Sequence, residues 1–323
     1  MDDPFDLSQT NAYSKWRARK LRAYPAENAD LRVPVGRLDQ PTPEERDALK
    51  TRIDTFNMAL VAVDPAEIQT ETLLAFTRAL GLRRADANLF ADASAVSHIA
   101  ASRTHPGRPH SGRTHSAGPN PGDETRVDTD LEPPGGTTLG EFIPYTDKPL
   151  SWHTDGYYNT TDEQVGAWCL FCVRAARHGG ENGLIDHEMA YLQLRDESPQ
   201  HIAALSHPQA LTIPAHVQDG RTRRAESVGP VFSVRNGHLH MRYSARARHV
   251  LWRDTPDTHA ARAALDRLFS RPDVFTFRYK LRPGEALVSN NVLHCRSGFD
   301  DDEDPAKARL LYRIRFLDRI DLD

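Results

Sequence analysis

The segment at residues 151–159 contains a His-x-Asp pair with the side chains to bind a metal ion. His153 and Asp155 are two positions apart, so in an extended strand their side chains point to the same side. An imidazole and a carboxylate are common ligands of Fe(II) and of Zn²⁺. A chain with 15 histidines contains about one such pair by chance, so the pair alone also fits a surface histidine beside a turn aspartate.

Another histidine, His294, supplies the third ligand of such a site. It follows a Pro-Gly turn at residues 283–284 and lies on a predicted strand. With His153 and Asp155 it makes a two-histidine, one-carboxylate set, which binds Fe(II) on one face and leaves other positions open. Arg309, at the next predicted strand, offers a rigid guanidinium fork for a distal carboxylate.

Three short blocks in this order resemble the TauD/TfdA family of Fe(II)- and 2-oxoglutarate-dependent dioxygenases, from about residue 40 to the C-terminus. They are Trp-His-Thr-Asp-Gly at 152–156, Gly-Gly-Glu-Asn at 179–182, and an ending at 283–313 that contains Pro-Gly-Glu, Asn-Asn-Val-Leu-His-Cys-Arg and Arg-Leu-Leu-Tyr-Arg. The resemblance implies oxidation, by default hydroxylation, of a small polar metabolite. The reaction uses O₂ and converts 2-oxoglutarate to succinate and CO₂.

The resemblance also implies roles for particular residues. The iron ligands and catalytic residues are His153, Asp155 and His294. Arg309 holds the distal carboxylate of 2-oxoglutarate, and Arg313 lies near the co-substrate or the primary substrate. The acidic segment at 300–304 lengthens the connection before Arg309, so Arg309 is favoured as the anchor and Arg313 remains the alternative. Where many relatives have threonine this chain has Asn182, whose amide can donate the same hydrogen bond to 2-oxoglutarate.

Two more residues, besides Arg313, are candidates for substrate binding. Tyr157 shares the strand face of His153 and Asp155, although core packing is an equal alternative. Arg296 shares the face of His294, with an ion pair to the acidic segment as its alternative role.

The elements that position these residues are mostly strands. Strands are predicted at 141–146, 165–173, 231–234, 239–243, 274–281, 286–293 and 310–317. Asn236-Gly237 is typical of a type I′ hairpin turn. Many strands with few helices predict a mainly β fold with peripheral helices and a β-sandwich or jelly-roll core, the double-stranded β-helix of the family.

Helices are predicted outside this core. Thr42-Pro43-Glu44-Glu45 has the residues of a capping box, and Asp64-Pro65 gives a second start signal. Further helices are expected at 186–195, 199–205 and about 258–270. Residues 1–40 are interpreted as an N-terminal arm and 41–323 as a single domain. Its long loop at 102–138 is either disordered or a lid that determines selectivity.

Composition excludes several classes of protein. The 323 residues carry a formal net charge of −4, without the basic stripe of a nucleic-acid binder. No apolar stretch is long enough to cross a membrane, and the acidic start is typical of neither a signal nor a transit peptide. Three cysteines favour a reducing cytoplasm, and Cys169 and Cys172 are expected to be buried thiols.

Two other functions stay open at this point. One is a non-catalytic jelly-roll binding module whose histidines belong to the core. The other is a zinc-dependent hydrolase with the same ligand set, although this function gives Arg309 no carboxylate to bind. The sequence leaves open which primary substrate is oxidised and by what outcome. It also leaves open whether the protein forms a homo-oligomer.

Overall fold

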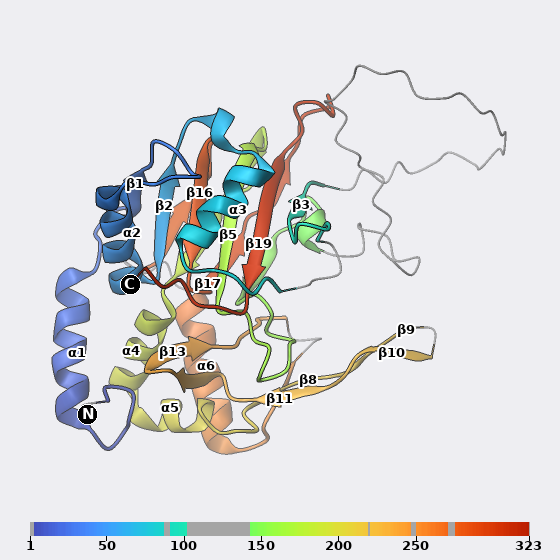
Figure 1. Ribbon diagram of the computed structural model, residues 1–323. Coiled ribbons are helices and arrows are strands. Elements are labelled where there is room, and N and C mark those ends of the chain that lie inside the picture. Colours follow the sequence, from blue (N-terminus) through green and yellow to red (C-terminus); the bar gives the residue numbers. More distant parts are fainter. Residues whose placement is uncertain are drawn as a thin grey trace.

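The computed structural model (Figure 1) describes residues 3–86, 91–101, 143–218, 220–246, 250–270 and 275–322. The described part is mainly β-sheet, with helices at its edge and over one face of the larger sheet (Figure 1). The predicted loop at 102–138 lies outside the described residues. In the part that is described, no helix has both the length and the apolar character needed to cross a membrane.

The larger sheet has six described strands in the order β1-β2-β16-β5-β19-β3. They are β1 (Arg32–Pro34), β2 (Met58–Ala62), β3 (Ser97–Ile99), β5 (Ala167–Arg174), β16 (Glu285–Ser289) and β19 (Leu310–Phe316). Neighbours are antiparallel except β1 and β2, which are parallel. Strands distant in the chain, such as β5 and β16, are therefore adjacent in the sheet.

The smaller sheet has the order β15-β7-β17-β4, and all its described pairs are antiparallel. Its strands are β4 (Leu150–His153), β7 (Asn182–Ile185), β15 (Phe277–Tyr279) and β17 (Leu293–Arg296). Side chains from both sheets form one apolar cluster, to which β2 contributes Leu60, β5 Trp168 and β7 Leu184. The two sheets therefore face each other across a shared core.

Helices α2 (Pro43–Phe56) and α3 (Thr70–Ala79) cover the other face of the larger sheet (Figure 1). Alternate residues of β2, such as Val61, pack there against Leu49 of α2 and Phe76 of α3. The predicted capping box is confirmed: Thr42 Oγ1 accepts a hydrogen bond from Glu45 N, and the Glu45 carboxylate accepts one from Thr42 N.

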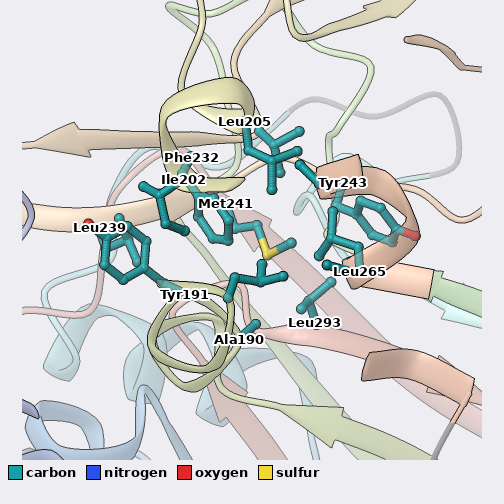
Figure 2. Close-up of a cluster of buried hydrophobic side chains, with 14 of the residues drawn as sticks. Ala190, Tyr191, Ile202, Leu205, Phe232, Leu239, Met241, Tyr243, Leu265 and Leu293 are labelled. Atoms are coloured by element: carbon teal, nitrogen blue, oxygen red, sulfur yellow. The ribbon is translucent and has the colours of Figure 1, made fainter. Parts of the chain in front are cut away.

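A second helical layer lies at the lower end of the sheets in Figure 1. It contains α1 (Thr10–Ala23), α4 (His187–Glu197), α5 (Pro199–Leu205) and α6 (Pro256–Ser270). Their buried side chains form a cluster with the hairpin of β12 (Phe232–Arg235) and β13 (His238–Met241), and Figure 2 shows Leu293 of β17 among its members. The outer face of the smaller sheet is thus packed against helices.

The remaining described elements are short. They are β6 (His178–Gly179), β8 (Leu211–Ile213), β9 (His216–Gln218), β10 (Arg221–Arg224), β11 (Ser227–Gly229), β12 (Phe232–Arg235), β13 (His238–Met241), β14 (Leu251–Trp252), β18 (Phe299–Asp300) and the 3₁₀ helices η1 (Asn28–Leu31), η2 (Pro65–Glu67) and η4 (Ile143–Tyr145). The predicted hairpin turn is confirmed, since Asn236 and Gly237 have φ values of 49° and 79°. The β9–β10 hairpin extends away from the body (Figure 1).

Several sequence predictions of secondary structure are wrong. Residues 143–145 form η4 rather than a strand, because Pro144 interrupts it and its carbonyl accepts from Arg296 instead of a neighbouring strand. Asp64 caps only the short η2, and α3 begins at Thr70. Helix α1, within the predicted arm, was not anticipated.

The predicted strand at 286–293 is two strands. β16 ends at Ser289 in the larger sheet, and β17 begins at Leu293 in the smaller one. Asn290 and Asn291 form the intervening turn, and Asn291 has a left-handed backbone with φ 53°. This turn carries the chain between the sheets just before His294.

Candidate metal centre

Two histidines face each other across the antiparallel pair β4–β17. His153 is the last residue of β4, and its Cα partner on β17 is His294. Cross-strand partners project their side chains to the same face, and these two ring centroids are 4.2 Å apart. Because Leu293 packs into the outer helical cluster, alternation along β17 directs His294 into the space between the sheets.

Asp155 completes the group from the segment after β4. Its Oδ1 lies 3.6 Å from His153 Nε2 and 3.9 Å from His294 Nε2. The ligand atoms of the three residues lie within 4.8 Å of one another, and no other group of this kind occurs among the described residues. The structure therefore brings together the three predicted metal ligands.

Each histidine is oriented by its second ring nitrogen. His153 Nδ1 lies 2.9 Å from Ser151 O, and His294 Nδ1 lies 3.0 Å from Val292 O. A carbonyl oxygen only accepts, so Nδ1 carries a proton, and Nε2 is the ring nitrogen that faces Asp155 and is placed to bind a metal. Burial, together with the neighbouring His153, lowers the pKa of His294 to about 3, which keeps this imidazole neutral.

The carboxylate of Asp155 is buried and ionised. Burial would raise its pKa, but Arg313 and then His153 hold the pKa well below the usual range. Arg313 Nη1 lies 3.5 Å from each carboxylate oxygen. Within the described part of the chain, Oδ2 makes no hydrogen bond. Two neutral imidazoles and one carboxylate are the protonation states that metal binding requires.

Arg309 is a buried cation next to β19. Its Nη1 has no hydrogen-bond partner among the described residues, and its guanidinium lies 4.8 Å from the ring centre of Phe299. Burial, and then the neighbouring Arg296, lowers the pKa of Arg309 to about 9. The opposing effect of nearby Asp301, which raises the pKa, is smaller than that of burial and of Arg296.

Asn182 lies beside Arg309 in the same small cavity, which is also lined by Cys172, Gly180 and Leu311. Asn182 Nδ2 donates to Tyr279 O at 3.4 Å, so one amide hydrogen remains for another acceptor. The cavity volume of 10 Å³ holds about one water molecule, so a carboxylate would enter only if the lining side chains shift.

The two predicted 2-oxoglutarate anchors therefore have different surroundings. Arg313 lies against the metal ligand Asp155, and its Nε has no hydrogen-bond partner among the residues described. Arg309 instead shares a cavity with Asn182 and has no ion pair in the described part of the chain. Of the two, Arg309 is the one without an ion pair among the described residues, and the choice of anchor stays a prediction.

The other predicted substrate residues differ in their contacts. The ring of Tyr157 stands edge-on to that of His153, with centroids 6.5 Å apart. The Arg296 guanidinium instead donates to three backbone carbonyls, those of Pro144, Thr146 and Lys148. Arg296 thus holds the segment that leads into β4, and its role in substrate binding stays a prediction.

Sequence reasoning missed Trp168 and Asn291. The ring centroid of Trp168 on β5 lies 4.8 Å from that of His294, and its Nε1 has no hydrogen-bond partner in the described structure. Side chains alternate between the two faces of a strand, so the run at 165–173 places Trp168 on one face of its strand. That this face packs against His294 follows only from the packing of the two sheets. Asn291 contacts Asp155, which its position near His294 in the sequence did not indicate.

Cys169 and Cys172 are buried, free thiols, as predicted, and Cys295 is a free, half-buried thiol. Cys169 and Cys172 pack into different clusters on opposite faces of the larger sheet. Burial raises the pKa of both thiols. They therefore lack the thiolate character of a redox or zinc pair.

A polar cavity of 520 Å³ lies away from the metal ligands, between α2, the β12–β13 hairpin and residues 317–322. Its lining includes basic side chains such as Arg235 and Arg319 and acidic ones such as Asp54 and Asp162. Neither the metal ligands nor Arg309 line it, so its size alone does not make it the reaction site.

Comparison with protein families gives an extended match. The sequence profile of the taurine catabolism dioxygenase TauD, TfdA family matches residues 18–315. The match includes all three candidate metal ligands and both candidate anchors.

Two relatives named uridine-5'-phosphate dioxygenase are similar in sequence. The one from Amycolatopsis sp is 32% identical over 195 residues, which cover 57% of this chain and 65% of that protein. The one from Streptomyces sp is 33% identical over 182 residues, which cover 52% of this chain and 62% of that protein. The chain thus spans less than two-thirds of either relative.

Among solved structures, the fold resembles that of the non-heme iron oxygenase OrfP in complex with Fe, succinate and (3R,4R)-dihydroxy-L-Arg. The TM-score is 0.59, with 88% of this chain and 83% of that chain covered. The sequences are 16% identical, so this likeness concerns the fold.

Proposed function

Because the chain belongs to the taurine catabolism dioxygenase TauD, TfdA family, we propose that it is an Fe(II)- and 2-oxoglutarate-dependent dioxygenase acting on a small polar metabolite. The observation that carries the proposal is the convergence of His153, Asp155 and His294, whose ligand atoms lie within 4.8 Å of one another. Hydroxylation is the proposed outcome.

The donor set fits Fe(II). Two neutral imidazole nitrogens and a carboxylate make the facial set of non-heme iron oxygenases and leave open positions for co-substrates. The free Nε2 atoms and the unbonded Oδ2 of Asp155 support this role. The same donors also suit zinc, so the ligands alone do not separate an oxygenase from a zinc hydrolase.

The surroundings of Arg309 favour the oxygenase. A buried guanidinium without an ion pair among the described residues is costly unless an anion joins it. We propose that Arg309 pairs with the distal carboxylate of 2-oxoglutarate, with Asn182 as a second donor. Arg313, beside Asp155, is placed to contact the co-substrate or the primary substrate near the metal.

Iron held by His153, Asp155 and His294 would supply the activation of O₂ for oxidation of the substrate, coupled to conversion of 2-oxoglutarate to succinate and CO₂. The protein's part is geometric and electrostatic. Val292 and Ser151 orient the imidazoles, and Trp168 packs against His294 from the larger sheet. Tyr157, edge-on to His153, is the proposed aromatic wall of the substrate site.

We further propose an anionic substrate, with a nucleoside monophosphate as the first candidate. The two similar proteins are named uridine-5'-phosphate dioxygenases. Arg313, which contacts Asp155 and whose Nε has no partner among the described residues, is a basic group beside the ligands that suits a phosphate or carboxylate.

The facing sheets and their antiparallel pairing support a double-stranded β-helix, or jelly-roll, core. We also propose residues 41–323 as one dioxygenase domain and residues 1–40 as an arm on it, since Tyr13 and Trp16 of α1 pack into the cluster of α4.

The free cysteines support a cytoplasmic location. A net charge of −4 argues against nucleic acid as a partner.

The proposal is tested by substrate-coupled turnover. The Fe(II)-loaded protein is incubated in air with 2-oxoglutarate and a panel of nucleoside monophosphates, phosphorylated sugars and amino acids. We expect one class to raise succinate formation and to gain the mass of one oxygen atom. Zinc-dependent hydrolysis without 2-oxoglutarate, or binding without any turnover, would contradict the proposal.

A further inference from the structure

The turn between β16 and β17 is built from two buried asparagines. Asn290 and Asn291 are each only 2% exposed, and Asn291 has a left-handed φ of 53°. Asparagine tolerates this conformation better than most other residues with a side chain. A buried amide has to be hydrogen-bonded, so its partners show what the turn holds.

The side chain of Asn291 binds both backbone polar groups of Asp155. Its Oδ1 accepts a hydrogen bond from Asp155 N at 2.8 Å, and its Nδ2 donates to Asp155 O at 3.0 Å. The same Nδ2 donates to Val165 O at 2.8 Å. Asp155 lies beyond the end of β4, where no strand pairing among the described residues fixes its backbone. The hydrogen bonds of the Asn291 amide fix it instead, whereas strand pairing fixes the backbone of His153 and His294.

The turn is held from its other side as well. Asn290 N donates to Asn57 O at 2.8 Å, and Asn290 Oδ1 accepts from Ile320 N at 2.9 Å. Val292 N donates to Ser289 Oγ at 2.9 Å. These bonds attach the turn to the end of α2 and to the C-terminal segment, and they restrain the position of Asn291.

We propose that Asn291 is a positioning residue of the metal centre that sets the carboxylate of Asp155 against the imidazole of His294. The inference rests on the proposed function, because it concerns affinity for the metal. Asn291 is three residues before His294 and bonded to Asp155, so it joins the segments of the last and the middle ligand. Groups that orient a metal ligand typically change metal affinity by about 10- to 100-fold.

The test compares Co(II) binding by calorimetry, with Co(II) as an air-tolerant stand-in for Fe(II). Asn291→Gly keeps the left-handed backbone and removes the amide. We expect its affinity for Co(II) to fall roughly 10- to 100-fold. Asn236→Gly is the matched control, since Asn236 is an exposed left-handed residue with φ 49°, and its Co(II) affinity should not change.

A second variant separates positioning from general stability. Asn290→Ala removes the bond to Ile320 N but leaves the contacts of Asn291 with Asp155. We expect Asn290→Ala to melt earlier yet to keep a Co(II) affinity close to that of the unaltered protein. If Asn291→Gly loses no more affinity than Asn290→Ala, the proposal is overturned.

A third variant applies if Asn291→Gly does not fold. Asn291→Asp keeps the size and the acceptor for Asp155 N but loses both donated hydrogen bonds, and an affinity loss of about 10-fold is expected. Unchanged affinity in this variant would overturn the role of Asn291. Failure of the unaltered protein to bind Co(II) at all would instead overturn the proposed metal function.

Discussion

His153 and His294 are direct cross-strand partners on β4 and β17, and their imidazole rings are 4.2 Å apart. The register of the smaller sheet therefore places two of the three candidate ligands. Asp155 lies outside the strands and depends on other contacts, those of Asn291 with its backbone and of Arg313 with its carboxylate. The centre thus combines a rigid pair with one ligand whose position is set by side chains.

The first prediction concerns Asp155. We expect Asp155→Ala to abolish 2-oxoglutarate turnover and to keep the fold, because Asn291 binds backbone atoms that alanine retains. Succinate formation and a circular-dichroism melt measure the two effects. Asp162→Ala, at an exposed position, is the control and should retain activity. Full turnover in Asp155→Ala would end the ligand assignment.

The second prediction separates the two arginines. Arg309→Ala should raise the 2-oxoglutarate requirement by roughly 30-fold or more, because loss of a buried charge partner costs about 2–5 kcal/mol. Its Co(II) affinity should stay near normal, since Arg309 has no contact with the metal ligands among the interactions of the described residues. Arg313→Ala should weaken binding of the primary substrate and, through the lost contact with Asp155, also lower the affinity for Co(II). If Arg313→Ala alone raises the 2-oxoglutarate requirement, the anchor assignment is reversed.

The third prediction concerns a buried ion cluster that includes none of the candidate metal ligands. Lys20 Nζ of α1 lies 2.6 Å from Asp186 Oδ2 and 2.6 Å from Glu188 Oε2, and all three residues are buried. Lys20→Met leaves two carboxylates without their cation, which should cost about 3–5 kcal/mol of unfolding free energy in urea.

The control for Lys20 is the exposed pair of Arg17 and Asp196. Arg17→Gln removes a pair whose arginine is 42% exposed, and such pairs contribute about 0–1 kcal/mol. Equal losses for Lys20→Met and Arg17→Gln would show that the buried cluster contributes no more than a surface pair.

The fourth prediction concerns how the stabilisation by the same cluster of Lys20, Asp186 and Glu188 changes with pH. Burial would raise the pKa of Glu188, but Lys20 outweighs it and lowers the pKa from 4.5 to about 2. A lowered folded-state pKa contributes stability that is present above pH 4.5 and is lost as the pH falls toward 2. The stability difference between the unaltered protein and Lys20→Met should therefore shrink on acidification, as measured by urea unfolding at a series of pH values. A constant difference would contradict this assignment.

The sequence predicted the parts of the site that follow strand periodicity. His-x-Asp spacing and the late histidine identified residues that the fold brings together, and the run at 165–173 predicted β5. The hairpin at Asn236-Gly237 was also predictable, because its turn chemistry is local. Whether these ligands bind iron stays part of the proposal.

Other features depend on partners that a single segment does not reveal. The apolar run at 286–293 resembles one strand, and only the left-handed Asn291 divides it between two sheets. Helix α1 has a polar composition, and its burial rests on Tyr13, Trp16 and the cation Lys20 meeting α4. The cover that Trp168 gives to His294 likewise arises from packing between sheets.

The most direct test of the account is anaerobic addition of Fe(II) and 2-oxoglutarate, followed by visible absorption spectroscopy. A weak charge-transfer band reports chelation of the metal by the co-substrate. The account predicts a band that saturates at one Fe(II) per chain, is absent in His294→Ala and needs much more 2-oxoglutarate in Arg309→Ala. No band in the unaltered protein, or an unchanged band in His294→Ala, would contradict it.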